Sequence, residues 1–128
     1  MDLFSDSWLK EFQERLNGDA EMQVIGEWFT TAFSLASDTR RCIVRFERGK
    51  LVDYVTSPRV DTRSQFGFRA PSEIWAKFLA PNPEPLYHDF FAMLMRVPAF
   101  VLEGDTLVAM QNARALHRAM NVMRRAGQ

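Results

Sequence analysis

The sequence is poor in cysteine and has no long apolar run. Its one cysteine, Cys42, excludes an internal disulfide bond and fits a reducing compartment. No stretch approaches the ~18 apolar residues that a membrane-spanning helix needs. The acidic start of the chain, with Asp2 and Asp6, lacks the basic flank and apolar core of a signal peptide. We therefore expect a cytoplasmic protein whose contact with membranes is at most transient.

The chain also lacks an excess of charge and a cluster of metal ligands. Its 16 basic residues balance 16 acidic ones, which argues against a nucleic-acid partner. Two histidines and one cysteine, far apart in the sequence, make no recognisable metal site, and no cofactor motif is present. We expect the arginines near the C-terminus to form a solvated helix face; they are Arg114, Arg118, Arg124 and Arg125.

Apolar residues, by contrast, are abundant enough for a substantial core. They make up 47% of the 128 residues, and 11 of them are phenylalanine. This length and composition predict one domain over residues 1–128. Periods of two and of 3.6 residues predict an α+β fold, in which helices cover one face of a five-stranded, mainly antiparallel sheet. The expected helices are 7–16, a short turn after Asp19, 71–79, 86–96 and one long helix from 106; the expected strands are 27–35, 42–47, 50–56, 65–70 and 99–103.

The final helix presents apolar residues at helical spacing on one face, among them Met110, Leu116 and Met120. Thioether side chains fill irregular cores, and they also line adaptable apolar binding sites. Periodicity alone does not distinguish these two uses. Further methionines, Met93, Met95 and Met123, leave the same alternative open.

Three segments resemble the sterol carrier protein type-two-like domain family. They are the hairpin 42–51, the strand followed by a tryptophan-containing helix at 68–79, and the strand, Glu-Gly-Asp corner and apolar helix that begin at 100–105. Their order matches this family from about residue 8 to residue 123. The resemblance implies a tunnel between sheet and helices that holds sterols, fatty acyl chains or similar molecules, and no shared catalytic residues.

Polar residues give little support for catalysis. His88 and Asp89 are neighbours in sequence and would point in different directions on a helix. Asp105 fits an N-terminal cap of the last helix better than a role at the mouth of a site with Glu103, and Cys42 fits a small buried side chain better than a nucleophile. We expect no enzymatic activity from the chain alone.

The leading hypothesis is therefore non-covalent binding of a long apolar or amphipathic ligand in an internal cavity. The alternatives are a small enzyme or accessory subunit that uses the same cavity, and a dimerisation module, or homodimer, with a dry core. The side chains expected to line the cavity or the adjoining core are Phe33, Val44, Phe46, Phe68, Trp75, Phe78, Leu94, Phe100, Leu102, Met110, Leu116 and Met120.

Overall fold

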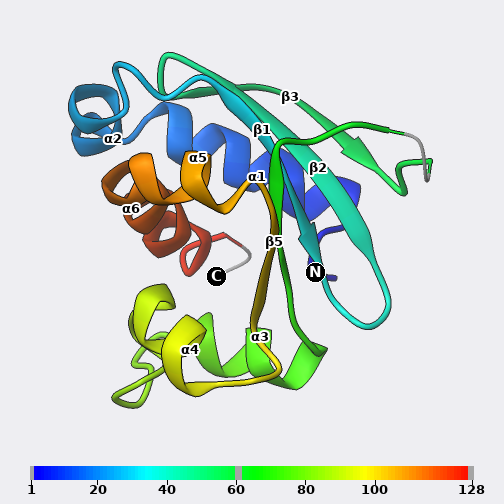
Figure 1. Cartoon of the computed structure of the whole chain (residues 1–128). Coiled ribbons are helices and arrows are strands. Elements are labelled where there is room, and N and C mark those ends of the chain that lie inside the picture. The colour runs from blue at the N-terminus through cyan, green and yellow to red at the C-terminus, as the bar shows by residue number, and fades with distance from the viewer. Residues whose placement is uncertain (1, 60–61, 127–128) are drawn as a thin grey trace.

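A computed structural model describes residues 2–59 and 62–126 as a sheet with helices packed on one face (Figure 1). The expected α+β class is confirmed. The helices are α1 (Asp6–Asn17), α2 (Ala20–Ile25), α3 (Ser72–Phe78), α4 (Phe90–Arg96), α5 (Thr106–Gln111) and α6 (Ala113–Met123). The strands are β1 (Thr31–Ala36), β2 (Arg41–Glu47), β3 (Lys50–Thr56), β4 (Phe66–Arg69) and β5 (Val101–Gly104).

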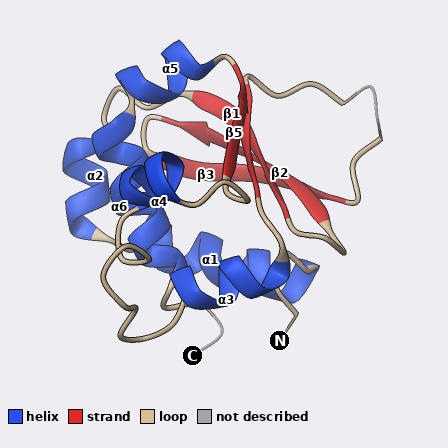
Figure 2. Ribbon diagram, turned by 60° about the horizontal axis from the view of Figure 1, so that its bottom comes forward, coloured by secondary structure: helices blue, strands red, loops and turns tan. Residues whose placement is uncertain are grey.

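The five strands lie in the order β3-β2-β1-β4-β5. All neighbouring pairs are antiparallel except β1 and β4, which are parallel. To make that pair, the chain leaves β3 at Thr56 and re-enters the sheet at Phe66, and the described parts of this connection lie away from the helices (Figure 2). The Gln65 amide donates to the Ala32 carbonyl at 2.8 Å, which fixes the start of β4 beside β1.

Side-chain caps explain where several helices begin. Ser5 accepts from the Trp8 amide at the start of α1, and Asp19 accepts from the Met22 amide at the start of α2. The expected helix over 86–96 is shorter than predicted: α4 begins at Phe90 because Asp89 caps it and Leu86 has a φ of 91°. The expected first strand is also shorter, because a turn that starts at Gly26 delays β1 to Thr31.

The predicted long final helix is wrong, because the chain breaks at Asn112 into α5 and α6. The Asn112 side-chain amide donates to the Val108 carbonyl at 2.9 Å. The Asn112 backbone N–H donates to the Ala109 carbonyl, three residues back, in place of the usual carbonyl four residues back. Asparagine commonly interrupts helices through such local bonds. The break turns Met110 away from the buried face of α6, and 39% of its surface is exposed.

The β2–β3 hairpin depends on a glycine at its turn. Gly49 has a φ of +80°, and a Cβ atom added to it would lie 2.7 Å from the Gly26 carbonyl oxygen. We therefore expect Gly49→Ala to lower the free energy of unfolding by about 1–3 kcal/mol. Gly18→Ala is the control, because Gly18 has a right-handed conformation and its added Cβ would meet no atom closer than 3.4 Å. Equal urea midpoints for the two variants would contradict this account of the turn.

Candidate functional site

The helix-facing side of the sheet carries a continuous row of aromatic rings. Phe33 lies opposite Val44 on β2 and Phe66 on β4, and its ring stacks with Phe46 and Phe66 at centroid distances of 5.6 and 5.2 Å. Phe68 extends the row and stacks with Phe100 at 5.8 Å. Alternation along each strand places these rings on one face, so the sheet presents an aromatic floor to the helices.

The helices cover this floor with further aromatic and thioether groups. The Trp75 ring packs edge-on against Phe78 and Phe100, and its indole N–H donates to the Ala36 carbonyl at 2.9 Å. On the other side, α6 contributes Leu116 and Met120, both buried. Sheet and helices thus enclose one hydrophobic cluster, which includes buried side chains from every strand except β5.

The structure shows where each side chain lies that we predicted to line the cavity. Phe33, Val44, Phe46, Phe68, Trp75, Phe78, Phe100, Leu116 and Met120 are buried in the cluster. Leu94 and Leu102 are partly buried against it, whereas Met110 lies at the surface, which corrects the expectation that it faces inward. Five surface hollows among the described residues are lined by other side chains. That the side chains expected in the cavity contact a ligand therefore stays a prediction.

A surface hollow of 580 Å³, which we call the Arg40 hollow, lies between the start of α1, the β1–β2 turn, α3 and the end of the described chain. Its floor includes Trp8, which is nearly buried. The Phe4 ring lies edge-on against both Trp8 and Trp75 at 5.3 Å, so the floor adjoins the hydrophobic cluster. The residues that line the hollow are Asp2, Leu3, Trp8, Ser37, Thr39, Arg40, Ser72, Ala76, Leu79 and Ala126.

No pattern in the sequence indicates the Arg40 hollow, since its residues come from four separate segments. The stretch from Ser37 to Thr39 predicts only a turn, and the structure contains that turn. The Ser37 hydroxyl oxygen accepts from the amides of Thr39 and Arg40 at 3.2 and 3.1 Å. A Ser-x-x-Arg turn beside an apolar wall is too common a pattern to indicate a site by itself.

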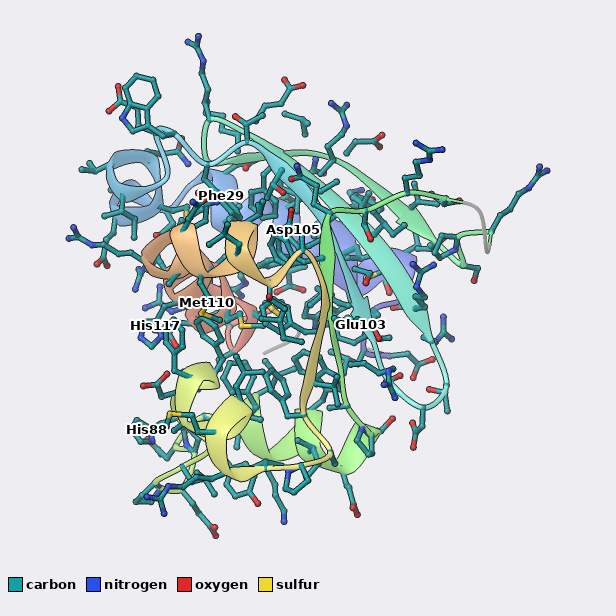
Figure 3. All side chains as sticks on the ribbon, in the orientation of Figure 1. Phe29, His88, Glu103, Asp105, Met110 and His117 are labelled. Carbon is teal, nitrogen blue, oxygen red and sulfur yellow. The ribbon has the colours of Figure 1, made fainter. Side chains whose placement is uncertain are left out.

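The polar candidates for catalysis do not converge. Figure 3 labels four of these side chains: His88 in the turn before α4, Glu103 on β5, Asp105 at the start of α5 and His117 on α6. Asp105 caps α5 by accepting from the Val108 amide, which confirms the capping interpretation, and Glu103 pairs with Arg69 at 3.5 Å. Asp89 lies 3.9 Å from the His117 ring nitrogen, a proximity that the sequence did not reveal.

Cys42 and the acidic residues offer no reactive or metal-binding arrangement in the part of the chain that is described. Cys42 is buried on β2, as expected, and desolvation raises the pKa of its thiol to about 12, so the nucleophilic thiolate is disfavoured. Among residues 2–59 and 62–126, no group of three or more His, Cys, Asp or Glu side chains is placed to hold a metal ion.

Two of the C-terminal arginines are not the solvated face that the sequence suggested. Arg118 forms a bidentate pair with Asp19 on α2, at 2.8 and 2.6 Å. Arg124 donates to the carbonyls of Phe78 and Tyr87 and lies over the Phe78 ring, so it joins the end of α6 to α3 and to the proline-rich segment after it. Burial lowers the pKa of the Arg124 guanidinium.

Comparison with known proteins identifies the architecture. No protein-family model and no curated protein sequence matches the chain. The structure nevertheless superimposes on a crystal structure of sterol carrier protein 2 with a TM-score of 0.79, over 98% of this chain and 100% of that one, at 18% identity. The fold is that of sterol carrier protein 2.

Two further structures share this sterol carrier fold. One is a conserved hypothetical protein from Thermus thermophilus, described as possibly a sterol carrier protein, with a TM-score of 0.76, 19% identity, and 98% and 90% of the two chains covered. The other is the ubiquinone synthesis protein UbiJ, with a TM-score of 0.59, 10% identity, and 93% and 89% of the two chains covered.

None of the described helices is both long and apolar enough to cross a membrane.

Proposed function

We propose that this protein binds a long apolar or amphipathic molecule, such as a sterol, a fatty acid or an acyl chain, for transfer or presentation. The observation that supports this most directly is the aromatic and thioether cluster between the sheet and the helices, in a fold shared over nearly the whole chain with sterol carrier protein 2. Such a cluster offers dispersion contacts along its length and no fixed polar partner, which suits a ligand with a long hydrocarbon part.

Ligand entry requires the cluster to open, and its composition makes opening feasible. Met93, Met120 and Met123 are all buried, and unbranched thioethers adopt new rotamers more readily than branched or aromatic side chains. These methionines lie on α4 and α6, which approach each other where the Phe90 ring lies 6.0 Å from the His117 ring. We infer that these two helices separate slightly when a chain enters between them and the sheet.

The proposed role is binding without chemistry. Acyl transfer or hydrolysis needs a nucleophile, a base and an orienting group in mutual contact. Among the described residues, the pair that most resembles part of such a set is Asp89 and His117, whose side chains lie 3.9 Å apart. Asp89 already caps α4.

An accessory role beside an enzyme is the second candidate, favoured by the fold likeness to the ubiquinone synthesis protein UbiJ. In that case the bound molecule would be presented to a partner rather than carried between membranes. Native mass spectrometry of the protein from its natural host separates these roles, because it detects a co-purifying lipid and a co-purifying protein partner in one measurement.

A displacement assay with a fluorescent fatty acid tests the binding proposal. We expect saturable binding by the parent protein, and Leu116→Trp should weaken it about tenfold or more because the added ring takes up space within the cluster. Met95→Trp is the matched control, since Met95 is an exposed helix residue. Thermal unfolding of both variants separates lost binding from lost folding. A folded parent that binds no probe would overturn the proposal in favour of a dry interaction module.

A further inference from the structure

The Arg40 hollow has one charged end and one apolar end. Among the ten described residues that line it, Arg40 is the only cation and Asp2 the only anion. Leu3, Trp8 and Leu79 form most of its apolar wall. A volume of 580 Å³ is within the range of sites that hold small ligands, roughly 300–1,000 Å³. This polarity matches a molecule with a charged head and a hydrocarbon tail.

We propose that the Arg40 hollow binds the carboxylate of a single-chain fatty acid, with the guanidinium of Arg40 as the head-group ligand. The inference rests on the proposed function and names the ligand class and the place of its polar end. The tail would lie along the apolar wall toward Trp8. From there Phe4 bridges to Trp75, at 5.3 Å from each ring, and so to the hydrophobic cluster.

The protein's own Asp2 carboxylate marks the position that the ligand's carboxylate would take. Asp2 lies 3.5 Å from a terminal nitrogen of Arg40, a long distance for an ion pair. The Asp2 side chain is 80% exposed and that of Arg40 46% exposed, and such pairs contribute little to stability. A fatty acid gains burial of its tail in addition to the ion pair, so it can displace Asp2 from Arg40.

The β1–β2 turn holds Arg40 at the mouth of the hollow. Because Ser37 accepts from the Arg40 amide, the backbone at Arg40 is fixed, while the guanidinium itself is held only by the long, exposed pair with Asp2 among the described residues. The Thr39 hydroxyl lines the same end and can donate to a carboxylate oxygen. The nearby Asp38 carboxylate lines an adjoining hollow instead and accepts from the Ser72 hydroxyl, so it does not occupy this end.

The test compares a saturated fatty acid with the fatty alcohol of the same chain length, each displacing a neutral fluorescent lipid probe. Arg40→Gln should weaken binding of the acid about tenfold and leave binding of the alcohol within about twofold. Asp2→Asn should change the affinity for the acid in the opposite direction and tighten its binding, because the substitution removes the competing carboxylate. Arg41→Gln is the matched control, since Arg41 is the next residue and does not line the hollow.

The outcomes separate this inference from the proposed function. If the parent binds both acid and alcohol and Arg40→Gln leaves their affinity ratio unchanged, the Arg40 hollow is not the head-group site, while lipid binding stands. If a folded parent binds neither compound, the proposed function fails and this inference fails with it. A reduced acid-to-alcohol ratio in Arg40→Gln, together with an increased ratio in Asp2→Asn, supports the assignment.

Discussion

Replacing Trp75 by alanine should lower the free energy of unfolding by about 3–5 kcal/mol, the cost typical of removing a large buried aromatic side chain. Trp75 has no exposed surface, and its ring meets Phe4, Phe78 and Phe100 at centroid distances of 5.3–6.1 Å. The substitution would also leave the Ala36 carbonyl without the indole donor that it has at 2.9 Å. The residue thus joins α3 to both the sheet and the start of α1.

The matched control for Trp75 is Trp28, another tryptophan of the same chain, which is 86% exposed. Trp28→Ala should change the free energy of unfolding by no more than about 0.5 kcal/mol. Trp75→Phe retains one aromatic ring but removes the N–H donor and part of the indole, so it should cost less than Trp75→Ala and include about 1 kcal/mol for the lost hydrogen bond. Urea unfolding followed by circular dichroism measures all three. Similar losses for the two alanine variants would refute the central position of Trp75.

Most of the sheet was predictable because short-range patterns determine it. The alternation of Val44 and Phe46 with the charged Arg45 and Glu47 identifies a half-buried strand, and Arg48-Gly49 identifies the hairpin that follows. The parallel pairing of β1 with β4 was not predictable in this way. It depends on where the chain returns after residue 57, and no local pattern encodes that choice between strand neighbours.

The final helix shows a second limit of periodicity. Ala109, Met110, Ala113 and Leu116 fit one helical face on a straight helix, but the break at Asn112 places Met110 at the surface. An asparagine interrupts a helix only when its side chain reaches a particular carbonyl, and the residue type alone does not specify which carbonyl that is.

The Arg40 hollow could not be predicted for a different reason. Its residues come from four distant segments, so no regular spacing in the sequence marks it.

Removing the Arg118 guanidinium should cost about 1.5–3 kcal/mol of unfolding free energy, the range expected for hydrogen bonds to a charged partner. Arg118 on α6 binds both Asp19 carboxylate oxygens, and Asp19 also caps α2 through the Met22 amide at 2.9 Å. Only 21% and 10% of the two side chains are exposed, so Arg118→Met would leave a largely buried carboxylate without its cation. Arg15→Met is the control: its pair with Glu11 on α1 is more exposed, and its loss should cost about 0.3–0.5 kcal/mol.

The cost of Arg118→Met should also depend on pH with a defined sign. The side-chain hydrogen bonds from Arg118 hold the pKa of Asp19 below its usual value of 3.8, and the Met22 amide acts in the same direction, against desolvation. The stabilisation is therefore complete above pH 3.8 and is lost as pH falls through the lowered pKa of the folded state, where the carboxylate becomes protonated. Urea unfolding of parent and variant should give a difference that is constant at neutral pH and shrinks below about pH 4. A difference that stays the same down to the onset of acid unfolding would contradict this account, because the Asp19 carboxylate loses its charge in that pH range.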